Sequence, residues 1–244
     1  MPELSALIPV ATDAAPVYLL RTEDWQSDLD LPADLIALAK AQKFKGAAGQ
    51  MVLSAAPDGT VSGVLFGVGQ GTDALAAAAL SAKLPAGDYQ IVRAADYTPA
   101  QLAAAWADGA YRFDKYLSEK ADPPRLVVGE DADGDAAIRE GVAIYRLRDL
   151  VNTPAEDMGP PQIQGTISDL AERYGAALET VIGDALLEQN YPMVHAVGRA
   201  GPEAPRISEL SWGDPSHPQL AIDGKGDAFD TGGLNLITGN SMGL

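Results

Sequence analysis

A glycine-rich segment near the carboxyl end of the chain holds the residues best suited to chemistry. In residues 224–233, glycines flank Lys225 and Asp230, which lie five residues apart after an apolar stretch. Glycine lets the backbone turn tightly and approach a ligand, and loops that follow strands in open α/β sheets often carry binding sites. An amine and a carboxylate at this spacing could bind a ligand. They could equally form a structural ion pair, and on physical grounds both interpretations stay open.

Three other motifs are weaker candidates. Residues 67–72 follow an expected strand and open an expected helix, as a phosphate-binding loop does, but their spacing fits neither GxxxxGK[ST] nor GxGxxG. We expect an ordinary connection there. Residues 239–243 match GxSxG, but the helix, Asp and His that such a serine needs do not follow, so the match is accidental. His195 and His217 are too few for a common zinc site and are expected to be structural.

Composition excludes several classes of function. The chain has 34 Asp and Glu against 17 Lys and Arg, a net charge of −17, which would repel the phosphates of a nucleic acid. The absence of cysteine excludes disulfides, thiol nucleophiles and iron–sulfur clusters. No apolar run approaches the roughly 18–20 residues that cross a membrane, and residues 1–20 lack a signal-peptide pattern. We therefore expect a soluble, cytoplasmic protein with neither nucleic acid nor membrane as partner.

The first part of the chain alternates segments with strand and helix patterns. Strands are predicted at residues 17–20, 51–55, 61–68, 89–93 and 126–129, and helices at 32–40, 72–84 and 99–117. The sequence Pro57-Asp58-Gly59 predicts the turn of a β-hairpin. The fold class is therefore α/β, with a largely parallel, covered sheet and a hairpin at one edge.

The pattern changes after residue 130. The acidic residues 131–135 are predicted to form a flexible hinge. Helices are predicted at residues 136–150, 160–174 and 184–189, and strands at 179–183, 193–197, 220–222 and 228–229. We expect a mixed-sheet amino-terminal α/β domain over residues 1–135 and a second, incomplete α/β domain over residues 136–244.

Three segments resemble the leucyl aminopeptidase (cytosol aminopeptidase) family of dinuclear metallo-aminopeptidases. They are Arg-Asp-Leu-Val-Asn-Thr-Pro-Ala at residues 148–155, Val-Gly-Arg-Ala at 197–200, and Gly-Lys-Gly at 224–226 with Phe-Asp-Thr-Gly-Gly at 229–233. Their order and intervals also match the family. The resemblance implies that the chain is the family's amino-terminal domain followed by the first part of its catalytic domain.

The resemblance implies a metal-dependent hydrolase that releases amino-terminal, leucine-like residues from peptides. Lys225 and Asp230 take the positions of two metal ligands, for two divalent ions that are zinc, manganese, magnesium or cobalt in the family. A lysine ligand must be neutral, and neighbouring cations could lower its pKa far enough. Members of the family usually form hexamers, so a homo-oligomer is implied as well.

The departures from the family pattern limit these expectations. Ile237 stands where the family has a catalytic lysine, so we assign no catalytic residue, and Asp223 and Asp227 replace apolar residues. The family's remaining metal ligands would lie beyond Leu244, which indicates a truncated chain. We expect weak or absent metal binding, little activity alone and doubtful oligomerisation. The alternatives are a catalytically degenerate partner of an intact hexamer and a nucleotide-binding module that uses residues 67–71.

Overall fold

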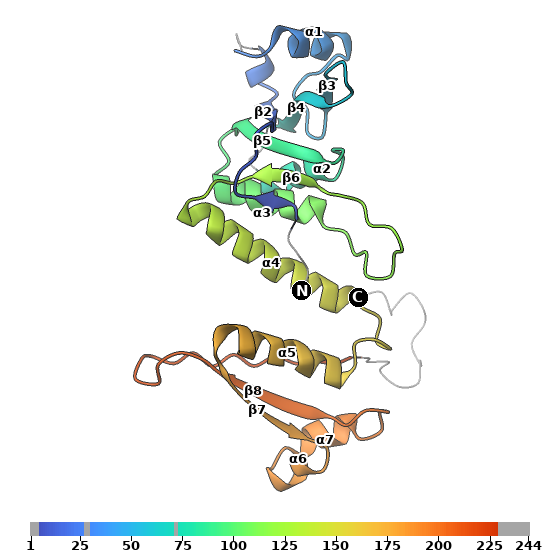
Figure 1. Cartoon of the computed structure of the whole chain (residues 1–244), viewed down its shortest axis with the longest axis vertical. Coiled ribbons are helices and arrows are strands. Elements are labelled where there is room, and N and C mark those ends of the chain that lie inside the picture. The colour runs from blue at the N-terminus through green and yellow to red at the C-terminus, as the bar shows by residue number, and fades with distance from the viewer. Residues whose placement is uncertain (1–4, 27–29, 71–72, 229–244) are drawn as a thin grey trace. The chain divides into compact units, whose positions relative to one another are not determined.

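The computed structural model describes residues 5–26, 30–70 and 73–228 of the chain. It divides into two compact units, Met1–Asp149 and Leu150–Leu244, whose elements are labelled in Figure 1. Within the described ranges, no helix has the length and apolar character needed to cross a membrane.

The first unit is built around a six-stranded sheet. Its strands are β1 (Leu7–Ile8), β2 (Ala15–Arg21), β3 (Met51–Ala55), β4 (Val61–Gly69), β5 (Gly87–Arg93) and β6 (Pro124–Val127). Its helices are α1 (Ala33–Ala41), α2 (Ala78–Ser81), α3 (Pro99–Ala110) and α4 (Ala132–Asn152), with short 3-10 turns η1 (Asp24–Gln26) and η2 (Ala74–Ala77). Helix α4 extends three residues into the second unit.

The sheet is mixed, in the order β1-β6-β5-β2-β4-β3. All neighbouring strands are parallel except β3 and β4, which form the predicted antiparallel hairpin at one edge. In its turn, Gly59 has a φ of +88°, and Asp58 Oδ1 accepts hydrogen bonds from the hydroxyl (2.7 Å) and the amide (2.9 Å) of Thr60. These bonds hold the pKa of Asp58 below its usual value. The predicted α/β class is confirmed.

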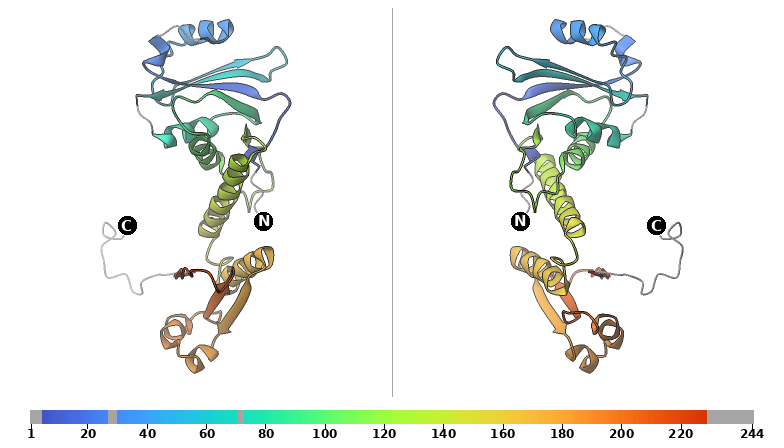
Figure 2. Two further views of the ribbon diagram at one scale, coloured as in Figure 1. Left: turned by 90° about the vertical axis from the view of Figure 1, so that its left-hand side faces the viewer. Right: turned by 90° about the vertical axis from the view of Figure 1, so that its right-hand side faces the viewer.

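The central strands β2 and β4 are covered on both faces. Leu19 and Phe66 pack into a large apolar cluster with residues of α3, whereas their neighbours Leu20 and Leu65 pack on the opposite face with Leu35 of α1. Figure 2 shows α1, in blue, on one side of the sheet and α2 and α3, in green, on the other. This two-sided burial explains why both strands read as nearly continuous apolar runs in the sequence.

Helix α3 is shorter than the sequence predicts. It begins with a capping box between Thr98 and Gln101 and ends at Ala110, so the prediction that it continues to residue 117 is wrong. Arg112 replaces the missing turn by donating hydrogen bonds to the carbonyls of Gly109 (3.1 Å), Tyr111 (2.8 Å) and Ala82 (3.4 Å). Of these bonds, the one to Ala82 is a tertiary contact, and tertiary context overrides the helical spacing of the apolar residues that follow.

Two further predictions about helices in this unit need correction. In the predicted helix 72–84, the helical residues are those of η2 and α2, which end at Ser81, and residue 72 lies outside the described ranges. The prediction of a flexible acidic hinge at residues 131–135 is wrong, because α4 begins at Ala132. The amide of Gly134 donates to Asp131 Oδ1 at 2.9 Å, and acidic residues in a first helical turn interact favourably with the helix dipole.

The described part of the second unit contains a two-stranded antiparallel sheet and three helices. Its elements are α5 (Pro160–Tyr174), β7 (Ala177–Ile182), α6 (Ala185–Glu188), α7 (Pro192–Gly198) and β8 (Arg206–Ser211). Helix α5 starts at its proline pair and ends at Gly175, whose φ of +63° terminates the helix as predicted.

Three strand predictions in the second unit fail or cannot be tested. Residues 193–197 belong to helix α7, which Pro192 begins at its first position. Residues 220–222 form no strand, and Leu220 and Ile222 are 85% and 84% exposed. The strand expected at 228–229 reaches outside the described residues, while β8, which pairs with β7, was not predicted.

Few side chains are buried in the second unit. Within its described part, the side chains of Thr153, Ala171 and Leu186 are buried, whereas Met193 and Trp212 are each 74% exposed. The described part of the second unit therefore has a much smaller apolar core than the first unit has.

Helices α2 and α3 pack closely at Gly109. A Cβ atom added there would overlap the carbonyl oxygen of Ala78, and Ser81 Oγ donates to the carbonyl of Trp106 at 2.9 Å beside it. We expect Gly109→Ala to lower the free energy of unfolding by about 1–3 kcal/mol through overpacking. Gly165 of α5 is the matched control, since a Cβ there has no neighbour within 4 Å. Gly165→Ala should raise stability by about 0.5–1 kcal/mol.

Urea-induced unfolding of the two variants and the parent chain would measure both effects. Equal effects of the two substitutions would contradict the packing of α2 against α3 at this glycine.

Candidate functional site

Lys225 lies in an irregular segment that follows β8. Residues 221–227 are exposed, and the Lys225 side chain, itself 79% exposed, forms an ion pair with the carboxylate of Asp227. A Cβ on Gly226 would lie 3.8 Å from Ile163 Cδ1, so the segment passes beside helix α5 of the same unit. The other predicted ligand, Asp230, and the departure at Ile237 both lie outside the described residues. The structure therefore does not test whether Lys225 and Asp230 face each other.

The described residues do not by themselves complete a metal site. Among them, no group of three or more His, Asp or Glu side chains is arranged to hold a metal ion. Lys225, paired with a carboxylate, is an ammonium group with three donors and no lone pair for a metal. Metal binding by Lys225 would require it to lose a proton and to leave Asp227.

The two acidic departures in this segment are not buried. Asp223 is exposed, and the Asp227 side chain is 32% exposed and paired with Lys225. Burial of an unpaired carboxylate costs a large amount of free energy, but neither Asp223 nor Asp227 is buried in this way.

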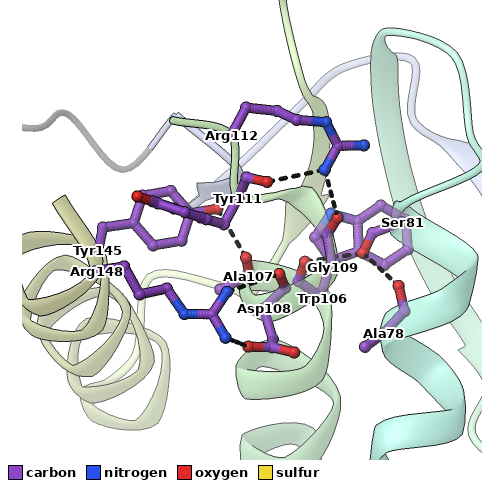
Figure 3. A network of polar contacts seen from close by, with 10 residues as sticks. All are labelled: Ala78, Ser81, Trp106, Ala107, Asp108, Gly109, Tyr111, Arg112, Tyr145 and Arg148. Carbon is purple, nitrogen blue, oxygen red and sulfur yellow. Dashed lines mark hydrogen bonds and ion pairs between the residues drawn. The ribbon is translucent and has the colours of Figure 1, made fainter. Parts of the chain in front are cut away.

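The first family-like segment packs two helices of the first unit together. Figure 3 shows Arg148 of α4 beside Tyr111 and paired with Asp108 of α3. The central carbon of the Arg148 guanidinium lies 5.1 Å from the centroid of the Tyr111 ring. Tyr111 in turn donates to Asp149 Oδ1 at 2.9 Å. Arg148 and Asp149, the first two residues of this segment, thus hold α4 against the end of α3.

Tyr145 joins the same network from the buried side of α4. Its hydroxyl donates to the carbonyl of Ala107 at 2.8 Å, and its ring lies 5.0 Å from that of Tyr111, edge to face. Burial raises the pKa of Tyr145 well above its usual value. Tyr145 lies within the helix predicted at residues 136–150, but the sequence did not indicate its partner at Ala107.

The loop at residues 67–70 is a structural connection. The amide of Gly67 donates to the carbonyl of Gln50 (2.8 Å), and that of Gly69 donates to the carbonyl of Gly46 (2.9 Å). A Cβ on Gly67 would collide with the backbone at Gly46, so glycine is required by the close approach of two chain segments. These amides are already used, which favours the interpretation as an ordinary connection over a phosphate-binding loop.

The two histidines lie apart from Lys225 in the sequence and show no metal-binding cluster in the described part of the chain. His195 Nε2 lies 3.2 Å from Asp184 Oδ1, and His217 is exposed.

A different charged group was not predicted from the sequence: Arg21 and Arg93, at the carboxyl ends of β2 and β5. Their place at the ends of two predicted parallel strands was the signal that could have revealed them.

Comparison with known families identifies both parts of the chain. The family model of the cytosol aminopeptidase family, catalytic domain, matches residues 145–244, and that of the M17 aminopeptidase, N-terminal domain, matches residues 15–129. The chain therefore belongs to the cytosol aminopeptidase (peptidase M17) family, a family of metal-dependent hydrolases, and comprises its amino-terminal domain and the start of its catalytic domain.

Individual relatives support this assignment. A probable cytosol aminopeptidase of Corynebacterium diphtheriae is 28% identical over 268 residues, which cover 98% of this chain and 53% of that protein. One of Methylorubrum populi is 30% identical over 146 residues, 54% of this chain and 29% of that protein. The chain thus spans about half the length of the Corynebacterium relative, and its match covers less than half of the Methylorubrum relative.

Solved structures agree with the fold. The crystal structure of a cytosol aminopeptidase from Coxiella burnetii matches with a TM-score of 0.75 and 27% identity, over 87% of this chain and 47% of that one. The bottromycin maturation enzyme BotP in complex with Mn matches with a TM-score of 0.60 and 27% identity, over 84% of this chain and 46% of that one.

The buried tyrosines predict how stability changes at high pH. Burial raises the pKa of Tyr89 to about 12 and that of Tyr145 further, whereas tyrosine in an unfolded chain ionises near pH ~10. The native state therefore keeps these protons longer than the unfolded state. The contribution of the two tyrosines to the free energy of unfolding is complete below about pH 10, and it is lost as the pH rises through their raised pKa values.

We expect the free energy of unfolding to fall above about pH 10, and Tyr145→Phe to make that fall shallower. At neutral pH the same substitution should cost about 1 kcal/mol, the value of the lost hydrogen bond to Ala107. Tyr174→Phe is the control, since Tyr174 is 56% exposed. Urea unfolding measured between pH 7 and 12 would reveal the effect. A pH profile that responds equally to both substitutions would contradict it.

Proposed function

We propose that this chain serves metal-dependent removal of amino-terminal residues from peptides, with a preference for leucine-like side chains. The observation that carries the proposal is that the catalytic-domain model of the cytosol aminopeptidase family matches residues 145–244, the range that includes Lys225 and Asp230. We further propose a cytoplasmic location and a division into an amino-terminal domain at residues 1–135 and a catalytic part at residues 136–244.

Lys225 and Asp230 are the proposed metal ligands. Divalent ions bound there would polarise the peptide carbonyl and lower the pKa of a bound water. Zinc, manganese, magnesium and cobalt are the candidates, and the structure of BotP in complex with Mn makes manganese the first to test. The exposure of Lys225 supports the proposal, because the side chain can leave Asp227 without disturbing a packed core.

The proposed ligands can be tested by metal binding. We expect the chain to bind Mn²⁺ weakly, and Lys225→Ala and Asp230→Ala each to weaken binding about tenfold or more, because each removes one of few donors. Lys40→Ala is the matched control, since Lys40 is an exposed lysine of α1. Titration calorimetry, or the electron paramagnetic resonance of free Mn²⁺, measures the affinity. Binding that neither ligand variant alters would argue against these positions.

The 244-residue polypeptide is expected to have little activity alone. A two-ion centre needs several protein ligands and a bridging water, whereas the resemblance implies two ligands here. Ile237 also lacks the hydrogen-bond donor of the family's lysine, and loss of such a donor costs about 10²–10³ in rate.

Hydrolysis of leucine p-nitroanilide by the purified polypeptide, with Mn²⁺ or Zn²⁺ added, would measure that activity. We expect turnover close to the background rate. Robust turnover that Asp230→Ala abolishes would contradict the expected weakness and would still support the proposed ligand.

A second candidate is a catalytically degenerate partner of an intact aminopeptidase hexamer, and Ile237 is the observation that favours it. Such a partner would join the oligomer and alter its activity without hydrolysing peptides. Co-expression with an intact cytosol aminopeptidase, followed by affinity purification and light scattering, distinguishes the two. A mixed oligomer supports the partner role, whereas a chain that stays apart from the intact enzyme contradicts it.

A further inference from the structure

The first unit has a second place suited to binding, at the carboxyl ends of β2 and β5. These strands are neighbours and parallel. The chain leaves β2 toward the β4 side of the sheet and leaves β5 toward the β6 side. Open α/β sheets bind ligands where adjacent connections diverge in this way, outside the carboxyl ends of the strands.

A cavity lies at this point of divergence. Its volume is about 380 Å³, and its lining includes Arg21 at the end of β2, Asp24 of η1, Arg93 at the end of β5, and residues 94–97. Pockets for small ligands begin at about 300 Å³, so the cavity can hold a small metabolite.

The two arginines supply more hydrogen-bond donors than their partners use. Arg21 donates from Nη1 to Glu23 at 3.1 Å and pairs through Nη2 with Asp96, while its buried Nε has no hydrogen-bond partner among the described residues. Arg93 Nη2 donates to Asp24 Oδ1 at 3.2 Å. A guanidinium has five donors in a planar fork that matches carboxylate and phosphate oxygens, so Arg21 can accept such a group.

The loop opposite Arg21 is strained. Ala95 and Asp96 have φ values of +47° and +69°, in the left-handed region that residues other than glycine seldom adopt. Such strain concentrates at ligand sites. The Asp96 side chain is 71% exposed even though it pairs with Arg21. The Asp96 carboxylate is therefore paired with an arginine that an anion from the solvent could also reach.

We propose that this cavity binds a small oxyanionic molecule, a carboxylate or a phosphate, whose oxygens replace the Asp96 carboxylate on Arg21. Arg93 supplies the second positive charge. The cavity lies in the first unit, and Lys225 is not among its lining residues. The end of β2 neighbours the loop at residues 67–70, since Arg21 pairs with Gly69 in the sheet, but the amides of Gly67 and Gly69 are already used. The proposal does not rest on the proposed peptidase function, because it needs no metal and no residue of the second unit.

Titration calorimetry of the full chain, without added metal, tests the site with inorganic phosphate and with glutamate as probes. We expect at least one probe to bind in the millimolar range or tighter, and the one that binds identifies phosphate or carboxylate as the ligand class. Arg21→Lys should weaken binding about tenfold or more, since lysine keeps the charge but loses the fork.

Asp96→Asn should strengthen binding about threefold or more, because it removes the competing carboxylate. Asparagine tolerates the left-handed backbone, so this variant stays informative even where Arg21→Lys fails to fold. Asp13→Asn is the matched control: it makes the same change in charge at an exposed residue before the amino end of β2, and should leave the affinity unchanged. Absence of binding by both probes, or equal affinities of Asp96→Asn and the parent chain, would overturn the proposal.

Discussion

The first unit depends on the burial of two adjacent parallel strands, β2 and β4, on both faces. Val17, Leu19 and Leu20 of β2 are fully buried, as are Val64, Leu65 and Phe66 of β4. Side chains alternate between the faces of a strand, so a helix is needed on each side of the sheet. Helix α1 covers one face, and α2 and α3 contribute to the cover of the other.

The same constraint affects where β2 carries charge. The faces of β2 pack against apolar side chains, and its charged residue is the last one, Arg21, while Arg93 lies at the corresponding end of the neighbouring strand β5. There they pair with carboxylates and line a cavity. The two-sided packing of β2 therefore leaves its charged side chain at the end of the strand, where the cavity lies.

The sequence predicted the elements whose signals are local and repeated. The β3–β4 hairpin, the parallel sheet and helix α5 followed from the turn at Pro57-Asp58-Gly59, the apolar runs, and the proline and glycine at the two ends of α5. Errors arose where distant contacts decide. Helix α3 ends at Ala110, and Arg112 beyond it donates to the carbonyl of Ala82, thirty residues away, a contact that has no local signal.

The candidate site was predicted less completely than the fold. The family-like segments identified the family, and both family models agree with that assignment. The ion pair of Lys225 with Asp227 was not predicted from the sequence, in which Asp230, at the other end of the glycine-rich loop, was the expected partner. The carboxylates that a lysine contacts in such a loop depend on the path of the backbone, which spacing alone does not give.

The sparse burial in the second unit has a consequence for its dynamics. Conformational entropy opposes folding in proportion to the number of ordered residues, while burial of apolar surface opposes unfolding. The buried side chains of its described part are Thr153, Ala171 and Leu186, so this part has little buried apolar surface to stabilise the pairing of β7 with β8. Amide hydrogens in this strand pair will exchange with solvent deuterium well before those of β2 and β4, so that the two units of one polypeptide report different opening energies.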